Sequence, residues 1–523
     1  MKAFTSEMKP SDVDLEDVLP GEKTNASKSS STLGGPPNNP SEEASAVQIL
    51  KWEKGDPENP YNWSLARKLA ITAIGILVTF NSTLGSSLPA NEISFIADTF
   101  HITDKNFQIL PMSIYLVGYI CGPIVFAPLS EFYGRRWITI ATFSLFTLST
   151  LAAALAPSWN ALLIFRLLAG IGASAPISIV GGIYADIYDS PIARGRAVAV
   201  YFTTVGFGPL VSPIIAGCSA PTIGWRWSFW IALIFAGVSF GGLIFLPETF
   251  GPKLLGDRAK RFRQDGTNLH IYGPLEVNNR GWRDLLHPRT LLPLRMLFTE
   301  PIVTVVCLYL ALLYGMFYMY FGAYSFIFQG VYEMSPCKSG AMFLPEGAGD
   351  LVAIALGAIY DNYIERKKEN DPPSDRAEEL FRLPPACVGG PITVLSIFWL
   401  GWTARTEVPW AVPFASGLVY GIGSQLIFIG LLNYLADAYT IYAASAFAAS
   451  SCSRSIFGAL LPLAVPKMYG TLGVAWATST LGFAVALMCI VPIALIKYGP
   501  YLRSRSSLCS QLRKEREDRE MEN

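Results

Sequence analysis

The chain has 523 residues, of which 51% are apolar and 15% are charged, and its 40 basic and 40 acidic residues give a net charge of zero. Soluble domains carry about 25% charged residues, so this composition argues against a soluble enzyme, and the lack of a basic arm argues against a nucleic-acid binder. The eight cysteines are scattered without CxxC spacing, which predicts neither a metal site nor a disulfide framework.

The N-terminal segment is polar and acidic. Residues 1–60 hold six Lys and eleven Asp or Glu, are rich in Ser, Pro, Asn and Gly, and have no apolar periodicity. This pattern predicts a disordered cytosolic tail over residues 1–66. No apolar stretch lies near the N-terminus, so we expect no cleavable signal peptide.

Twelve apolar runs of about 18–25 residues follow, and each is long enough to cross a hydrocarbon core of roughly 30 Å. Runs this long and continuous indicate helices, because barrel strands alternate and are about ten residues long. The expected fold is therefore an all-α membrane protein with twelve transmembrane helices, at 69–90, 107–128, 137–156, 160–181, 197–217, 227–246, 302–326, 340–360, 386–403, 409–432, 441–465 and 472–496.

The spacing of these runs divides the chain into two six-helix halves, 67–246 and 302–497. A polar linker over 247–301 joins them, and a C-terminal tail covers 498–523. Lys and Arg are concentrated in the loops on the side of both tails, which predicts that both termini are cytosolic. Two six-helix halves around a central site are common in secondary transporters, and no nucleotide-binding GxxxxGK[ST] motif is present.

The string Pro128-Leu129-Ser130-Glu131-Phe132-Tyr133-Gly134-Arg135-Arg136 lies between the second and third runs. Any basic turn on the cytosolic side can contain a glycine and arginines, but the full string resembles the signature loop of the major facilitator superfamily. The resemblance implies a major facilitator fold and a cytosolic gate formed by Glu131, Gly134, Arg135 and Arg136, with Asp186 as a partner for either arginine.

Arg166 lies within the fourth run, where a buried arginine costs roughly 2.5–3.5 kcal/mol on insertion scales. Either backbone carbonyls satisfy it, or it takes part in proton transfer, the role that the resemblance implies. Gly170 and Gly172 follow it and predict close helix packing.

The fifth run contains small residues and prolines, which predict a bent helix at a tight interface. Its Gly206, Gly208, Pro209 and Pro213 resemble the antiporter motif of drug:proton exporters. The match is incomplete, because Ser212 and Ala216 stand where that family tends to have glycine.

Further strings tie residues from about 50 to 505 to one subgroup. They are Asp56-Pro57-Glu58-Asn59-Pro60, Gly224-Trp225-Arg226-Trp227-Ser228-Phe229-Trp230, Leu246-Pro247-Glu248-Thr249-Phe250 and Asn433-Tyr434-Leu435 with Asp437. They resemble the fungal twelve-span drug:proton antiporter family. The resemblance implies a transporter driven by the proton gradient without cofactor, metal or nucleotide. It also implies a small-molecule substrate, no nucleic-acid partner, a monomer in a lipid bilayer, and the plasma membrane, with the vacuolar membrane open.

Glu346 and Asp350 are the acids inside the runs, and their i, i+4 spacing places both on one helix face. Two anions this close in a low dielectric are costly, so we expect the pair to titrate as a coupled unit and to carry protons. Arg454 is a candidate counter-charge. A static Asp350–Arg454 ion pair that positions two helices is the alternative.

The seventh run is rich in aromatic residues, and Tyr314, Tyr318 and Phe321 fall on one helix face. Together with Tyr119 and Gln425 they are candidates for a substrate cavity, although Tyr also collects at membrane interfaces. We expect an exporter of small amphipathic drugs, toxins or fungal metabolites. Polyamine or nutrient transport is the second reading, and a non-transporting receptor or enzyme is the third.

Overall fold

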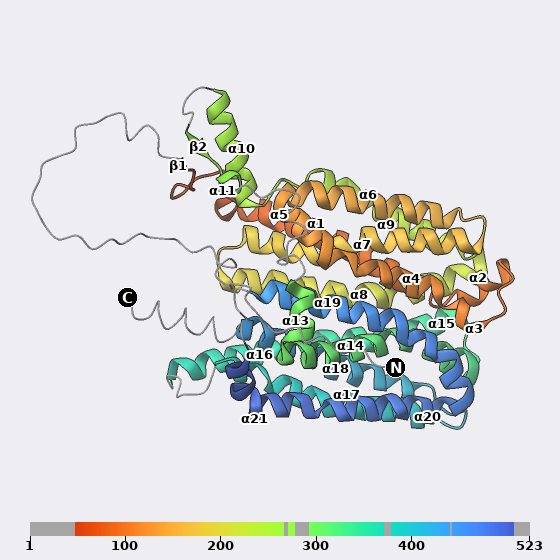
Figure 1. The fold of residues 1–523 in the computed structure, drawn as a ribbon. Coiled ribbons are helices and arrows are strands. Elements are labelled where there is room, and N and C mark those ends of the chain that lie inside the picture. The colour runs from red at the N-terminus through yellow and green to blue at the C-terminus, as the bar shows by residue number, and fades with distance from the viewer. Residues whose placement is uncertain (1–47, 266–269, 278–291, 371–377, 440–441, 507–523) are drawn as a thin grey trace, which may run out of the picture.

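The computed structural model describes residues 48–265, 270–277, 292–370, 378–439 and 442–506, and it is almost entirely helical (Figure 1). In chain order, the elements that precede the long helix α14 are β1 (Gln48–Ile49), η3 (Pro60–Asn62), α1 (Leu65–Ser87), α2 (Ile93–Thr99), α3 (Lys105–Gln108), α4 (Leu110–Tyr119), η4 (Gly122–Phe126), α5 (Ala127–Tyr133), α6 (Arg135–Ala154), α7 (Trp159–Ile187), α8 (Pro191–Ile223), α9 (Arg226–Ile244), α10 (Gly251–Gln264), β2 (Ile271–Tyr272), α11 (Pro274–Val277) and α13 (Leu292–Thr299).

The second half of the chain repeats the pattern of long helices. Its elements are α14 (Pro301–Tyr324), η5 (Ser325–Val331), α15 (Pro336–Ala341), α16 (Leu344–Asn370), η6 (Glu378–Arg382), α17 (Pro384–Thr403), α18 (Ala411–Tyr439), α19 (Ala443–Leu460), η8 (Leu461–Ala464), α20 (Val465–Met488) and α21 (Ile490–Arg505). Helices α1–α9 form one half, and α14–α21 form the other beside it (Figure 1).

The long helices account for twelve membrane crossings. Eleven helical stretches of the described residues are long and apolar enough to span a bilayer, and the last of them, Ala443–Arg505, has 63 residues. At about 1.5 Å per residue that stretch is far too long for a single crossing. Gly473 interrupts it with a non-helical φ of +70° and ψ of 170°, so it divides into two crossings. The predicted twelve-helix all-α fold is therefore confirmed.

Two ends of the bundle are distinguished by what they carry (Figure 1). β1, α10, α11 and the end of α21 lie at one end, which we call the tail-proximal end. The short helices α2, α3 and α15 lie at the other, the tail-distal end.

Within the first half, an added Cβ at Gly170 would lie 2.1 Å from the backbone oxygen of Tyr115, which confirms close helix packing at this glycine.

Residues 48–66 are ordered, so the predicted disorder of the whole 1–66 segment is wrong for this part. β1 pairs in parallel with β2 of the linker, through Gln48 opposite Ile271. Asp56 forms an ion pair with Arg258 of α10. Composition predicted disorder because the acidic segment has no apolar periodicity of its own. Its ordering comes from a basic linker helix about 200 residues away in sequence, since Asp56 and Arg258 are 202 positions apart.

The cysteines also depart from the sequence prediction. Cys218 of α8 and Cys337 of α15 form a disulfide across 119 residues of chain, with their Cα atoms 4.2 Å apart. The cysteine spacing predicted no disulfide framework, and this one disulfide departs from that prediction. Spacing along the chain carried no information about this pair, because packing of the two halves brings the two helices together.

Candidate functional site

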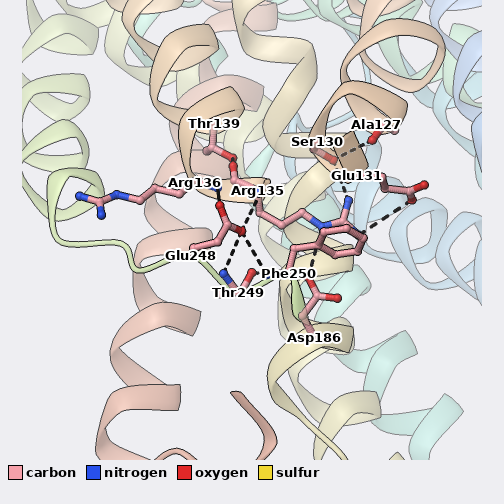
Figure 2. Close-up of polar contacts among 10 residues, drawn as sticks. All are labelled: Ala127, Ser130, Glu131, Arg135, Arg136, Thr139, Asp186, Glu248, Thr249 and Phe250. Atoms are coloured by element: carbon pink, nitrogen blue, oxygen red, sulfur yellow. Dashed lines mark hydrogen bonds and ion pairs between the residues drawn. The ribbon is translucent and has the colours of Figure 1, made fainter. Parts of the chain in front are cut away.

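A charged cluster at the tail-proximal end of the first half surrounds Arg135, the first residue of α6 (Figure 2). Its Nε donates to Asp186 Oδ2 over 3.2 Å, and Nη1 donates to Ser130 Oγ over 2.6 Å. Glu131, four residues before Arg135, lies 4.0 Å from the guanidinium and is largely exposed. The predicted contact between Asp186 and Arg135 is present.

The start of α6 is capped by a residue that the sequence motif did not single out. Glu248 accepts hydrogen bonds from the backbone N–H groups of Arg135 and Arg136, at 2.8 and 3.2 Å (Figure 2). Its negative charge lies at a helix N-terminus, where the helix dipole favours an anion. Gly134 has a φ of +95°, and a Cβ there would lie 2.2 Å from Glu248 Oε2. The glycine is therefore required both by its backbone conformation and by the carboxylate.

A second charged cluster occupies the corresponding place in the other half. Arg382, just before α17, donates to Asp361 of α16 over 2.7 Å and to Asp437 of α18 over 2.8 Å. The first half places Arg135 before Asp186 at the end of its fourth span, and the second half repeats this order. We call these two groups the N-latch (Glu131, Arg135, Asp186, Glu248) and the C-latch (Asp361, Arg382, Asp437). Repetition of the arginine position between the halves could have indicated the C-latch.

Arg166 of α7 is 2% exposed and is satisfied by backbone oxygens. Its guanidinium donates to Pro111 O and Gly85 O, each over 2.8 Å, and to Ser86 O over 3.3 Å. The Tyr115 ring lies 4.3 Å from it in a cation–π arrangement. Backbone carbonyls therefore satisfy Arg166 in this conformation, as the first of the two sequence alternatives describes.

Glu92 is a buried acid that the sequence search missed, because it lies two residues beyond the predicted first span. It is 0% exposed, accepts a hydrogen bond of 2.7 Å from Ser228 through Oε1, and its Oε2 has no partner among the described residues. Burial raises the pKa of the Glu92 carboxyl well above its usual range, although the Ser228 bond and the nearby Arg166 charge act in the opposite direction.

The prolines of α8 leave backbone groups that other helices satisfy. Pro213 has no N–H, so the carbonyl of Pro209, four residues earlier, lacks its helical partner. Ser87 at the end of α1 donates to this carbonyl over 2.8 Å. A Cβ at Gly208 would lie 2.0 Å from Thr83 Oγ1. The antiporter-like motif therefore packs α8 tightly against α1, as the sequence predicted.

Glu346 and Asp350 both lie on α16, facing α8 and α18. Glu346 is 2% exposed, and its Oε2 has no hydrogen-bond partner in the described part of the chain. Asp350 Oδ2 lies 3.3 Å from the position of a Cβ at Gly206, so it faces the antiporter-like motif. The Asp350 carboxylate thus lies at the contact between the halves.

Arg454 does not act as their counter-charge in this conformation. No ion pair joins it to Asp350 within the described ranges. Its Nε donates to Ser450 O over 3.4 Å, and its guanidinium lies 5.5 Å from the Tyr314 ring and 5.7 Å from the Phe428 ring. The Asp350–Arg454 pairing considered from the sequence is therefore corrected, because α14 and α18 side chains surround Arg454.

The aromatic candidates gather mostly between α1, α4 and α14. The Tyr314 and Tyr318 rings are 5.0 Å apart, and Tyr318 shares a 2.7 Å hydrogen bond with Ser86 of the other half. Tyr119 donates to Ser82 O over 2.6 Å. Phe321 extends the cluster toward Phe343, at 4.9 Å between ring centroids. Gln425 is half-buried on α18.

Twelve spans in two halves, with a latch at the same end of each half, define a multi-pass membrane protein with the architecture of a secondary transporter. The family model described as Major Facilitator Superfamily matches residues 75–462. The chain therefore belongs to the major facilitator superfamily.

The relatives are fungal transporters. The MFS-type transporter penM of Penicillium rubens is 35% identical over 466 residues, which cover 87% of this chain and 89% of penM. The efflux pump radE of Floropilus chiversii is 34% identical, with 93% and 90% of the two chains covered. The MFS-type efflux pump MFS2 of Trichophyton rubrum is 35% identical, with 88% and 78% covered.

Solved structures show the same fold at lower identity. The xylose transporter XylE from E. coli, in a partially occluded inward-open conformation, aligns with a TM-score of 0.61 at 17% identity. The alignment covers 83% of this chain and 98% of XylE. The human organic anion transporter MFSD10 aligns with a TM-score of 0.55, also at 17% identity, over 81% of this chain and 99% of MFSD10.

Proposed function

We propose that this protein exports small amphipathic organic compounds in exchange for protons, with Glu346 and Asp350 as the proton-carrying pair. The observation that carries the proposal is the buried Glu346 carboxyl, whose Oε2 has no hydrogen-bond partner among the described residues. A buried carboxyl without a cation beside it is costly when ionised and is stabilised by a proton. Relatives named as efflux pumps support export as the direction.

The surroundings of Glu346 suit a group that alternates between two protonation states. Tyr420 presents a hydroxyl that also lacks a partner in the described residues, and its ring lies 4.6 Å from that of Tyr320. The backbone of Gly421 packs against the carbonyl of Glu346, where an added Cβ would lie 2.2 Å from that oxygen. A change of charge at Glu346 would therefore act directly on the packing of α16 against α18.

We further propose that the tail-proximal end is cytosolic and that the protein acts as a monomer in the plasma membrane. The excess of Lys and Arg in the tail-proximal loops supports this orientation. The Cys218–Cys337 disulfide supports it independently, because it lies at the opposite end and disulfides persist in oxidising compartments. In this orientation the N-latch and the C-latch hold the cytosolic ends of the spans.

Purified protein in liposomes tests the coupling, with the planar cation ethidium and the neutral dye Nile red as probes. Glu346→Gln keeps the shape of the side chain but cannot ionise. We expect it to lower proton-driven transport at least about tenfold while the probe still binds, because the loss falls on turnover rather than on ground-state binding.

The matched control is Glu407→Gln, which changes an exposed acid at the tail-distal end and should leave transport unchanged. Full transport by Glu346→Gln with an ordinary pH dependence would overturn its role as proton carrier. Transport of spermidine in place of both dyes would favour the polyamine alternative.

A further inference from the structure

The tail-distal ends of α8 and α15 form a contact between the two halves that we call the cysteine seam, defined by Pro213, Gly217 and Cys218 on α8 and by Pro336, Cys337 and Gly340 on α15. The Cys218–Cys337 disulfide crosses it. Because α8 belongs to the first half and α15 to the second, this bond ties the halves together covalently at the tail-distal end.

Backbone atoms touch on both sides of the disulfide. A Cβ at Gly217 would lie 2.3 Å from Pro336 O, and a Cβ at Gly340 would lie 2.4 Å from Pro213 O. Both glycines permit an approach that any larger residue would prevent. The two helices are therefore in direct main-chain contact for about one turn beside the covalent bond.

Asn91, which follows α1, braces the same contact. Its side-chain amide donates to Pro213 O and to Pro336 O, each over 3.2 Å, so a single group bonds to both sides of the cysteine seam. Its Oδ1 accepts a 3.3 Å hydrogen bond from Ser325 of η5. Asn91 is 4% exposed, which shields these bonds from competition with water.

The contact between the halves becomes looser along α8 toward the tail-proximal end. There α8 faces α16, and a Cβ at Gly347 would meet the side chains of Leu210 and Phe207 at 3.1 and 3.2 Å. At Gly206 the nearest group is the Asp350 carboxylate. Side chains can repack when helices move, whereas the main-chain contacts and the disulfide of the cysteine seam cannot.

The remaining contacts between the halves near the tail-distal end are not covalent. Ser86 of α1 bonds to Tyr318 of α14, α3 contacts α20, and Leu116 of α4 packs near Gly458 of α19. Each can break and reform at modest cost, since a hydrogen bond contributes about 0.5–1.5 kcal/mol net. In the part of the chain that the structure describes, only the cysteine seam holds a covalent bond between the halves, which ordinary thermal motion cannot open.

We propose that the cysteine seam is a fixed hinge of the transport cycle. The halves part on the tail-distal side by separating α1 and α3 from α14 and α20, while α8 and α15 remain together. Opening is then one-sided rather than a symmetric rocking of the two halves. This inference rests on the proposed transport function, and alternating access must proceed with the disulfide intact.

The first experiment establishes the bond itself. A protease site is inserted between residues 278 and 291 of the full chain, and the cleaved protein is run on denaturing gels. We expect the two halves to migrate together without reductant and apart after reduction. Cys218→Ser with Cys337→Ser should separate in both conditions. Halves that separate without reductant in the unsubstituted protein would overturn the proposal.

The second experiment measures motion with pairs of spin labels, after the free cysteines are replaced by alanine and the disulfide is kept. One pair spans the cysteine seam at the exposed positions Ile223 and Lys338, and the other joins Lys105 of α3 to Leu472 of α20. Between acidic and alkaline buffer, we expect the α3–α20 distance distribution to shift and the seam distribution to stay fixed. Equal shifts in both pairs would refute a hinge.

The rate of transport distinguishes a disulfide that acts as a hinge from one that holds the protein in a single conformation. We expect ethidium transport at the same rate with the disulfide oxidised as after reduction, because a hinge does not have to open. Transport that appears only with reductant would mean that the bond locks the protein shut, and the proposal fails. If neither dye is transported in any condition, the proposed substrate class fails, while the gels and the distances still decide the hinge.

Discussion

Glu92 has an electrostatic environment that its position in the sequence does not suggest. Glu92 lies outside the twelve spans, yet it is fully buried beside Arg166. Among the described residues, its side-chain carboxyl accepts one hydrogen bond, from Ser228, through one of its two oxygens. Burial raises its pKa in the folded protein. The folded state therefore binds more protons than the unfolded state at pH values between the two pKa values, and the stability falls as the pH rises through that window.

We expect Glu92→Gln to abolish this loss, because Gln keeps an oxygen that accepts from Ser228 but cannot ionise. The midpoint of thermal unfolding should match that of the unsubstituted protein in acid and exceed it at neutral and alkaline pH. Thermal unfolding in detergent across a pH series measures both, with Glu53→Gln in the exposed N-terminal segment as the control. An identical difference at every pH would contradict the explanation.

Among the elements, the ordered N-terminal segment depends on α10. Arg258 donates to Asp56, and the Asp56 carboxylate also accepts a 2.9 Å bond from the backbone of Glu58. These two bonds lower the pKa of Asp56. A carboxyl with a lowered pKa stabilises the folded arrangement above its unfolded pKa, and that contribution is lost as the pH falls through the folded pKa.

Asp56→Asn should therefore release the segment at neutral pH, whereas the unsubstituted protein releases it only in acid. Limited proteolysis of residues 48–64 measures the release. We expect cleavage to speed up by roughly fivefold at most, since an ion pair with a partly exposed partner contributes about 1 kcal/mol or less. Lys54→Gln, at an exposed position of the same segment, is the control. Unchanged cleavage would show that β1–β2 pairing alone holds the segment.

On the scale of the whole molecule, the N-latch and the C-latch repeat one arrangement in the two halves. In each, an arginine at or just before the start of a helix bonds to an acid at the end of a neighbouring span, at 3.2 Å for Arg135–Asp186 and 2.8 Å for Arg382–Asp437. The two latches share no residue. Each half therefore has its own cluster of ion pairs that joins neighbouring spans at the tail-proximal end.

We expect Arg135→Ala to lower the free energy of unfolding by about 1.5–3 kcal/mol, because it removes largely buried, charge-assisted hydrogen bonds. Arg382→Ala should lower it by about 1 kcal/mol or less, because both of its acid partners are more than a third exposed. The losses should add in the double variant within about 0.5 kcal/mol, as they do for distant sites without shared partners. Thermal unfolding midpoints test this, with the exposed Arg261→Ala as control. A double variant no worse than either single variant would indicate that the latches act as a single unit.

Sequence patterns predicted the features that arise within a single helix. The twelve spans follow from runs of apolar residues, the close packing at Gly170 from its small size, and the shared face of Glu346 and Asp350 from helical periodicity. The Arg135–Asp186 contact was also predicted, because the string around Arg135 resembled a loop of known arrangement.

Features that depend on two distant segments were not predictable in the same way. Glu248 caps a helix that begins 113 residues earlier, as its bond to Arg135 N shows, and the order of residues 48–66 depends on the linker helix. Asp350 and Arg454 looked like partners because each is a charge inside an apolar span and the two have opposite sign. The packing of the helices places Arg454 among side chains of α14 and α18 instead of beside Asp350. Sequence spacing carries no information about the rotation of one helix against another.

The Cys218–Cys337 bond also has a consequence for how the protein is made. It closes a covalent ring of chain that includes the sixth span, the entire linker between the halves and the seventh span. In the orientation proposed above, Cys218 emerges first during synthesis and has no partner in this bond until Cys337 has also crossed the membrane. The first half must therefore insert with the Cys218 thiol still free. The disulfide can form only after both halves have inserted and packed against each other, so its presence shows that this assembly has taken place.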